Sequence, residues 1–162
     1  MSNLNMPPEI STQLDLALRL LVSLLLGMAV GTERESSRHP AGLRTLALVS
    51  MGSCLFSSIA LLTVGGGQDL TRIAAQVVTG IGFLGAGTIL FEKDRSSVIG
   101  LTTAATLWVV AAVGTAIGMG LYVEAIFGTF MVFFTFMVLS KVVSEVRKRT
   151  ANHQPHDTAR EQ

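Results

Sequence analysis

The chain has 162 residues, which is the length of one domain, and 14% of them are charged, against about 25% in an ordinary soluble domain. No charged residue falls within five windows: 20–32, 45–68, 73–91, 96–123 and 125–140. A soluble globular protein is excluded, because it needs charged residues on the outward face of nearly every element. The net charge of +1 excludes a nucleic-acid binder, and the single cysteine excludes a disulfide framework within the chain. The sequence therefore predicts an integral membrane protein in a lipid bilayer.

The first apolar segment is the shortest and has two interpretations. It spans the membrane if its helix begins near Leu16 and Arg19 extends its long side chain toward the membrane surface. The alternative is a secretory signal peptide, which needs a basic leader. Residues 1–15 contain Glu9 and Asp15 but no lysine or arginine, so we expect a membrane helix here.

The later segments supply four more helices, since a hydrocarbon core of roughly 30 Å needs about 20 helical residues. Windows 45–68 and 73–91 fit one span each, and 96–140, charged only at Glu124, holds two spans with a turn at 118–120. The expected helices are 16–31, 43–64, 73–91, 98–117 and 121–141. They predict an all-α bundle of five transmembrane helices over residues 15–143, with a flexible N-terminal segment (1–14) and a polar cytoplasmic tail (144–162).

The basic residues predict how the bundle is inserted, because short loops rich in lysine and arginine stay in the cytoplasm. With five spans, the loop after the first helix, the loop after the third and the segment after the fifth share one face of the membrane. These segments carry nine basic residues: Arg34, Arg38, Arg44, Lys93, Arg95, Lys141, Arg147, Lys148 and Arg149. The opposite face has Arg19 and Arg72. The N-terminus is therefore expected outside and the C-terminus in the cytoplasm.

The second expected helix has a polar face. Small polar side chains recur on it at helical spacing: Ser50, Ser53, Cys54, Ser57 and Ser58. Small hydroxyl residues let neighbouring backbones approach closely, which is one explanation. The other is a polar wall that lines a pathway through the membrane.

Glycines are concentrated in the third expected helix. Its Gly80, Gly82, Gly85 and Gly87 match a dinucleotide-binding pattern, but they lie inside an apolar span rather than at a strand-to-helix turn. Either a neighbouring backbone packs very close to them, or the helix is broken there and offers backbone groups to a ligand. The pairs Gly27/Gly31 and Gly114/Gly118 also suit close helix crossings.

The fourth expected helix opens with a threonine and alanine face. Thr102 and Thr106 share a face, as do Thr103 and Thr106, and the intervening alanines permit tight packing. Trp108 lies too deep for the aromatic belt at the membrane surface and is expected to fill core volume.

Charged residues gather on the expected cytoplasmic side. The candidate functional cluster there consists of Glu33, Arg34, Glu35, Arg44, Thr45, Glu92 and Asp94, with Thr102, Thr103 and Thr106 nearby in the chain. Mutual ion pairing is one interpretation, since opposite charges alternate along both segments. The other is a site for a hard cation built from Glu33, Glu35, Glu92 or Asp94, because Mg²⁺ favours one or two carboxylates plus retained waters.

Catalysis has no support in the sequence. No nucleophile, base and orienting group form a recognisable set, and His39, His153 and His156 lack the spacing of a metal motif. We therefore expect a protein that is not an enzyme and requires no cofactor, with Mg²⁺ as the ion to consider.

Four motifs follow one another as they do in the transmembrane domain of the MgtC/SapB family of bacterial inner-membrane proteins, which the chain resembles over roughly residues 15–140. They are Gly31-Thr-Glu-Arg-Glu35, Ala41-Gly-Leu-Arg-Thr45, Gly80-Ile-Gly-Phe-Leu-Gly-Ala-Gly87 and Gly100-Leu-Thr-Thr-Ala-Ala-Thr-Leu-Trp108. The resemblance implies a five-helix multi-pass protein of the inner membrane. It also implies adaptation to low Mg²⁺ and, for virulence-associated members, survival inside macrophages and restraint of the F1Fo ATP synthase.

The chain departs from the family pattern in three places. Members often carry a C-terminal domain resembling an ACT fold, whereas a short polar segment follows the last helix here. The chain has Leu46 where histidine is common, and Thr102 where virulence members tend to have asparagine. We expect a regulator or adaptor in Mg²⁺ homeostasis that forms a homo-oligomer or contacts a membrane-protein partner. The alternative is a transporter or channel for Mg²⁺ or another small cation, acting as an oligomer.

Overall fold

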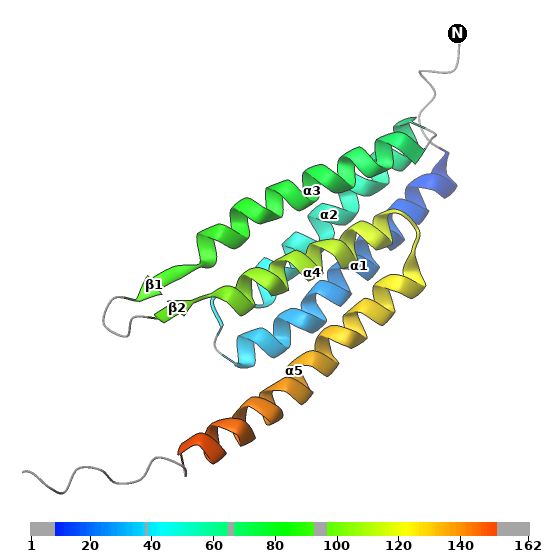
Figure 1. Cartoon of the computed structure of the whole chain (residues 1–162). Helices are drawn as coiled ribbons and strands as arrows, with labels where there is room; N and C mark the ends of the chain where they lie inside the picture. The colour runs from blue at the N-terminus through cyan, green and yellow to red at the C-terminus, as the bar shows by residue number, and fades with distance from the viewer. Residues whose placement is uncertain (1–8, 38, 65–66, 93–96, 152–162) are drawn as a thin grey trace, which may run out of the picture. The chain divides into compact units, whose positions relative to one another are not determined.

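The computed structural model of the chain describes residues 9–37, 39–64, 67–92 and 97–151 (Figure 1). Its helices are α1 (Ile10–Ser36), α2 (Leu43–Val64), α3 (Gly67–Thr88), α4 (Leu101–Gly118) and α5 (Tyr122–Ala151). Two short strands, β1 (Leu90–Glu92) and β2 (Ser97–Ile99), lie between α3 and α4. The chain divides into two units, Met1–Thr129 and Phe130–Gln162, so α5 begins in the first unit and continues into the second.

The predicted helical class is therefore confirmed, with differences at the helix ends. Helix α1 begins at Ile10 rather than near Leu16, so its early turns are more polar than the apolar pattern predicted, and they include one side of an ion pair. Arg19 Nε lies 2.7 Å from Asp15 Oδ2 one turn earlier, a spacing at which helical side chains meet. Of the expected flexible segment 1–14, residues 10–14 are helical and 1–8 lie outside the described residues. The expected tail 144–162 is helical as far as Ala151, and the remainder also lies outside them.

The strands are a feature that the all-α prediction lacks. They form an antiparallel pair in which Leu90 is opposite Ile99 and Phe91 is opposite Val98. The chain then enters α4 through Gly100, whose φ of +90° is a conformation that glycine adopts readily. A Cβ atom at Gly100 would also collide with the carbonyl oxygen of Thr88, at the end of α3. Glycine at position 100 is thus what allows the hairpin to end directly in α4.

Helix α2 lies between α1 and α4, and both neighbours approach it through glycines. A Cβ atom added at Gly27 of α1 would lie 2.7 Å from the carbonyl oxygen of Leu46, and one at Gly31 would lie 2.6 Å from Leu43 Cα. Both distances are shorter than real Cβ contacts. The expected close crossing at Gly27/Gly31 is therefore present between α1 and α2.

The Gly114/Gly118 pair makes the matching contact from α4. A Cβ atom at Gly114 would collide with the carbonyl oxygen of Ser50, and one at Gly118 would lie 2.7 Å from Ser57 Cβ. Two glycine pairs on different helices thus let the backbones of α1 and α4 approach one α2 surface, and Gly27 and Gly114 both meet Ser50 there. This contact forms the centre of the first unit.

The surface that these glycines meet is the predicted polar face of α2. All five of its small polar residues are buried: Ser50, Ser53, Cys54, Ser57 and Ser58. Ser50 Oγ lies 2.9 Å from Ser23 Oγ of α1, and Ser58 donates to the carbonyl oxygen of Gly118 at 3.3 Å. Ser57 donates to the carbonyl of Ser53 in its own helix at 2.9 Å. These contacts favour the packing explanation over a polar wall along a pathway.

Four helical segments in the described part of the chain are long and apolar enough to cross a membrane. They are Ile10–Ser36, Leu43–Thr63, Leu101–Gly118 and Tyr122–Leu139. Their outward faces carry large apolar side chains such as Leu25, Phe56 and Phe127, which suits contact with lipid. Helix α3 is as long as α2 but less apolar, because it contains Arg72, Gln76 and several glycines. The structure therefore shows a helical membrane protein with four such segments and a fifth, more polar helix.

Candidate functional site at the charged helix ends

Arg34 is the buried charge of the predicted cluster. It lies near the end of α1 with a relative exposure of 4%, and its Nε is 3.1 Å from Glu33 Oε2. The Glu33 side chain remains 30% exposed, and its Oε1 accepts a hydrogen bond from Ser37 Oγ at 3.2 Å. Burying a charge is costly unless it is paired, so the contact with Glu33 explains how Arg34 is held inside. The ion-pairing interpretation therefore applies to these two residues.

Glu35 performs a different task from Glu33. Its Oε2 accepts the backbone N–H of Leu43 at 3.1 Å, which satisfies one of the amides that the first turn of α2 leaves open. The carboxylate lies against Gly42, where a Cβ atom would collide with it. Glu35 thus joins the end of α1 to the start of α2, and Gly42 provides the room. A glycine directly before a predicted helix was the sequence signal for this contact.

The remaining predicted residues are distributed differently. Arg44 and Thr45 are exposed on the first turn of α2. Thr103 and Thr106 are buried in α4, whereas Thr102 is exposed, so the predicted threonine face is divided between core and surface. Thr106 Oγ1 donates to the carbonyl of Thr102 at 2.7 Å, a bond within the helix.

The predicted cation site is only partly described by the structure. The Glu33 and Glu35 side chains are described, whereas the side chain of Glu92 and the whole of Asp94 lie outside the described residues. Within the described part, no group of three histidine, cysteine or acidic side chains could hold a metal ion. Glu33 Oε2 and His39 Nδ1 are buried polar atoms that make no hydrogen bond there, although Glu33 Oε2 lies 3.1 Å from Arg34 Nε. His39 lies next to the cluster, with its backbone N–H donating to the carbonyl of Arg34 at 3.0 Å, although its spacing in the sequence matches no metal motif.

The glycines of α3 do not mark a break in the helix, and three of the four have no close neighbour in the described part of the chain. The helix is unbroken from Gly67 to Thr88, so it offers no exposed backbone to a ligand. Nothing lies within 4 Å of a Cβ atom added at Gly80, Gly82 or Gly87, so no neighbouring backbone packs against these positions in the chain. Gly85 alone of the four has a neighbour, Ala104 Cβ of α4 at 3.5 Å, which is an ordinary contact.

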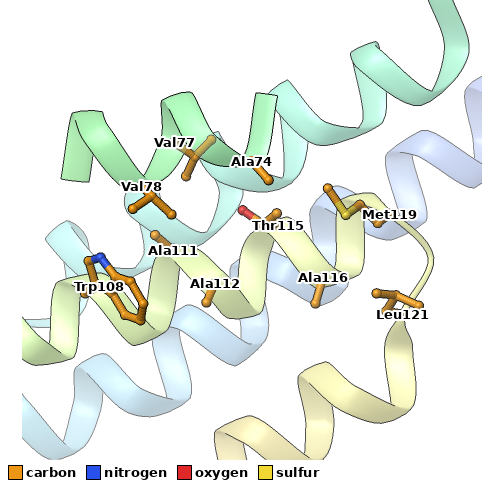
Figure 2. Close-up of a pocket in the computed structure, with 10 residues that line it drawn as sticks. All are labelled: Ala74, Val77, Val78, Trp108, Ala111, Ala112, Thr115, Ala116, Met119 and Leu121. Atoms are coloured by element: carbon orange, nitrogen blue, oxygen red, sulfur yellow. The ribbon is translucent and has the colours of Figure 1, made fainter. Parts of the chain in front are cut away.

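A cavity of about 280 Å³ lies between α3 and α4 (Figure 2). Of the ten residues that line it, Thr115 and Trp108 carry the only polar side-chain atoms. Trp108 is 51% exposed, so the expectation that it fills core volume is wrong. Figure 2 shows it on α4 near Ala111 and Ala112, among the residues that line the cavity.

Arg19 forms a second group of polar contacts, away from the charged cluster. The sequence predicts that its side chain reaches the membrane surface. Besides the ion pair with Asp15, its Nη1 donates to the carbonyl oxygen of Gly118 at 2.9 Å, and its guanidinium lies 5.8 Å from the centre of the Tyr122 ring. The last carbonyls of a helix lack partners within it and favour a cation. Arg19 therefore ties α1 to the turn between α4 and α5.

Apolar helices of membrane length, close glycine crossings and charged helix ends define a multi-pass helical membrane protein. A sequence model of the MgtC family matches residues 20–145. The chain belongs to the MgtC family, which confirms the resemblance found in its motifs.

Several curated relatives are similar to the chain. The uncharacterised protein slr0014 of Synechocystis is 46% identical over 87% of this chain and 57% of its own length. YhiD of Escherichia coli K12, named as a candidate magnesium transporter, is 42% identical over 86% of this chain and 65% of its own. Protein MgtC of Salmonella typhimurium LT2 is 39% identical over 81% of this chain and 55% of its own length. The chain thus spans little more than half the length of several of these relatives. No solved structure matches it significantly.

Proposed function

We propose that the chain is a bacterial inner-membrane protein that acts as a regulator or adaptor in adaptation to low Mg²⁺. Family membership and the magnesium-related name of a relative support the physiological setting. The adaptor role means that the protein works through helix contacts, with a second copy or with another membrane protein. Because of the family resemblance, the F1Fo ATP synthase is one candidate for this membrane-protein partner. Virulence is one physiological process in which the adaptor would act.

The observation that carries this proposal is the packing of the polar face of α2. That face carries four serine hydroxyls, and such a surface would be a natural lining for a cation path. In the structure it is occupied by α1 and α4, whose glycines bring backbone atoms into contact with Ser50 and Ser57. Its hydroxyls are engaged with Ser23 and with the carbonyls of Ser53 and Gly118. Packing of this kind supports a contact-based role over passage of ions through one copy.

The membrane topology is part of the proposal. Helix α3 runs alongside α2 and α4 and has comparable length, so we place it in the membrane as a fifth span (Figure 1). The basic residues near the end of α1 and the start of α2 then lie in the cytoplasm, together with the C-terminus. The N-terminus lies outside.

Cation transport by an oligomer is the second candidate, and one observation favours it. Glu33 Oε2 is a buried carboxylate oxygen that makes no hydrogen bond in the described residues and whose contact there is the ion pair with Arg34 Nε, at 3.1 Å. Mg²⁺ is commonly held by one or two carboxylates and its retained waters, so Glu33 would be a ligand in this alternative. The name of the Escherichia coli relative points the same way.

Mg²⁺ entry into liposomes separates the two candidates. We expect liposomes that contain the purified chain to take up Mg²⁺ at the rate of protein-free liposomes, with an ionophore as the positive control. Glu33→Gln keeps the size of the side chain and removes its charge, and it should leave that rate unchanged. Uptake well above the protein-free rate that Glu33→Gln abolishes would establish transport and contradict the regulator proposal.

A further inference from the structure

The outward face of α3 is unlike the other apolar surfaces of the chain. Gln76 lies near the middle of this helix and is exposed, with Thr79 beside it on the same side. Phe83 is 82% exposed one to two turns further on. Gly80 and Gly87 flank it at helical spacing, with open space above both. This face, defined by residues 76, 79, 80, 83 and 87, therefore combines a primary amide with a large aromatic ring and vacant glycine surface.

Lipid is a poor partner for such a face. An amide without hydrogen-bond partners in an apolar medium costs several kcal/mol, whereas glutamine in membrane helices hydrogen-bonds across helix interfaces. Glycine gives lipid chains little side-chain surface but lets another helix approach closely. A groove of about 380 Å³ adjoins this face between α3 and α2, and Gln76 and Gly80 lie on its α3 side, opposite Phe56. The face thus has the features of an interface between membrane helices.

We propose that a second copy of this chain covers the outward face of α3. Two copies inserted the same way are related by a two-fold axis along the membrane normal, so their α3 helices run parallel and each residue near the axis meets its own counterpart. Glutamine suits that geometry, because its amide both donates and accepts and two such amides pair reciprocally. Phe83 of each copy then packs beside the glycine surface of the other. The inference rests on the proposed function for the placement of α3 in the membrane.

Cysteine cross-linking tests the contact at the residue proposed to lie on the axis. The native Cys54 is buried, so the full chain carrying Cys54→Ser provides the background. In vesicles of Escherichia coli polar lipids, Gln76→Cys should form a disulfide-linked dimer in most chains on oxidation, because a disulfide requires Cβ atoms about 4 Å apart. Leu21→Cys is the matched control, since Leu21 is exposed midway along α1. It should remain monomeric. Absence of the Gln76→Cys dimer, or equal dimer yields from both variants, would overturn the proposal.

A second variant tests the interface without a cross-link. Gly80→Leu adds a side chain whose Cβ has nothing within 4 Å and which starts in an open groove, so the single copy should fold normally. Subunit counting by single-molecule photobleaching in the same vesicles should show the association constant reduced at least tenfold. Ala17→Leu places a leucine of the same final size at an exposed position of α1 and should leave association unchanged. An unchanged association constant in Gly80→Leu would overturn the proposed surface. A dimer that also conducts Mg²⁺ would overturn the regulator role alone.

Discussion

Replacing Gly114 with alanine is expected to destabilise the chain by about 3 kcal/mol, the upper part of the usual range for overpacking a filled core. The added methyl group would collide with the carbonyl oxygen of Ser50, and that oxygen belongs to the backbone of α2. A backbone atom in a helix cannot move away as the end of a flexible side chain can. The loss of stability should appear in SDS-induced unfolding in mixed micelles, followed by circular dichroism.

Gly80→Ala is the matched control for Gly114→Ala. Both positions lie within helices, but a Cβ atom at Gly80 has nothing within 4 Å. Alanine favours a helix over glycine by about 1 kcal/mol, so Gly80→Ala should be neutral or slightly stabilising. Equal unfolding free energies for the two variants would show that the close crossing of α4 and α2 is absent in the protein.

Replacing Arg34 with leucine is expected to destabilise the chain by about 2 kcal/mol. Removing one partner of a fully buried ion pair costs about 3–5 kcal/mol, and the partial exposure of Glu33 reduces that cost because water reaches its carboxylate. The variant leaves the buried Oε2 atom of Glu33 without the guanidinium that now lies 3.1 Å away. The same unfolding measurement applies, with the double variant Arg34→Leu/Glu33→Gln expected to recover part of the loss.

Arg44→Leu controls for the loss of positive charge at this end of the helices. Arg44 is exposed on the first turn of α2, so its replacement should change stability by no more than about 0.5 kcal/mol. If Arg44→Leu and Arg34→Leu were equally destabilising, net charge rather than the buried contact with Glu33 would be responsible.

The sequence predicted the helices well because charge-free length and glycine turns mark membrane helices directly. It also identified the residues of the α2 face and the two close-crossing glycine pairs, since helical spacing alone places them together. It missed the hairpin of β1 and β2, because strands of three residues leave no periodic pattern to recognise. The predicted start of α1, near Leu16, was wrong for a related reason. The polar turns before Leu16 are helical and are followed by the Asp15–Arg19 pair, although a scan for apolar residues places them outside the helix.

The candidate site was harder to predict, because side-chain contacts depend on which neighbours face each residue. Glu33 and Glu35 look equivalent in the sequence, yet one contacts Arg34 and the other accepts the first amide of α2. The α3 glycines were expected to be packed or to mark a break, and the structure shows an unbroken helix with an open face. Four glycines within a membrane helix indicate that another backbone approaches the helix closely. The pattern does not say whether that backbone belongs to the same chain or to another one.

Growth at limiting Mg²⁺ tests most directly the claim that the protein works through the outward face of α3. Cells that lack their own copy of the gene would express the full chain or its variants at equal levels in the membrane. We predict that the unchanged chain, Ala17→Leu and Glu33→Gln all restore growth, whereas Gly80→Leu does not. Full growth with Gly80→Leu and loss of growth with Glu33→Gln would contradict the account and favour a cation route through the carboxylates.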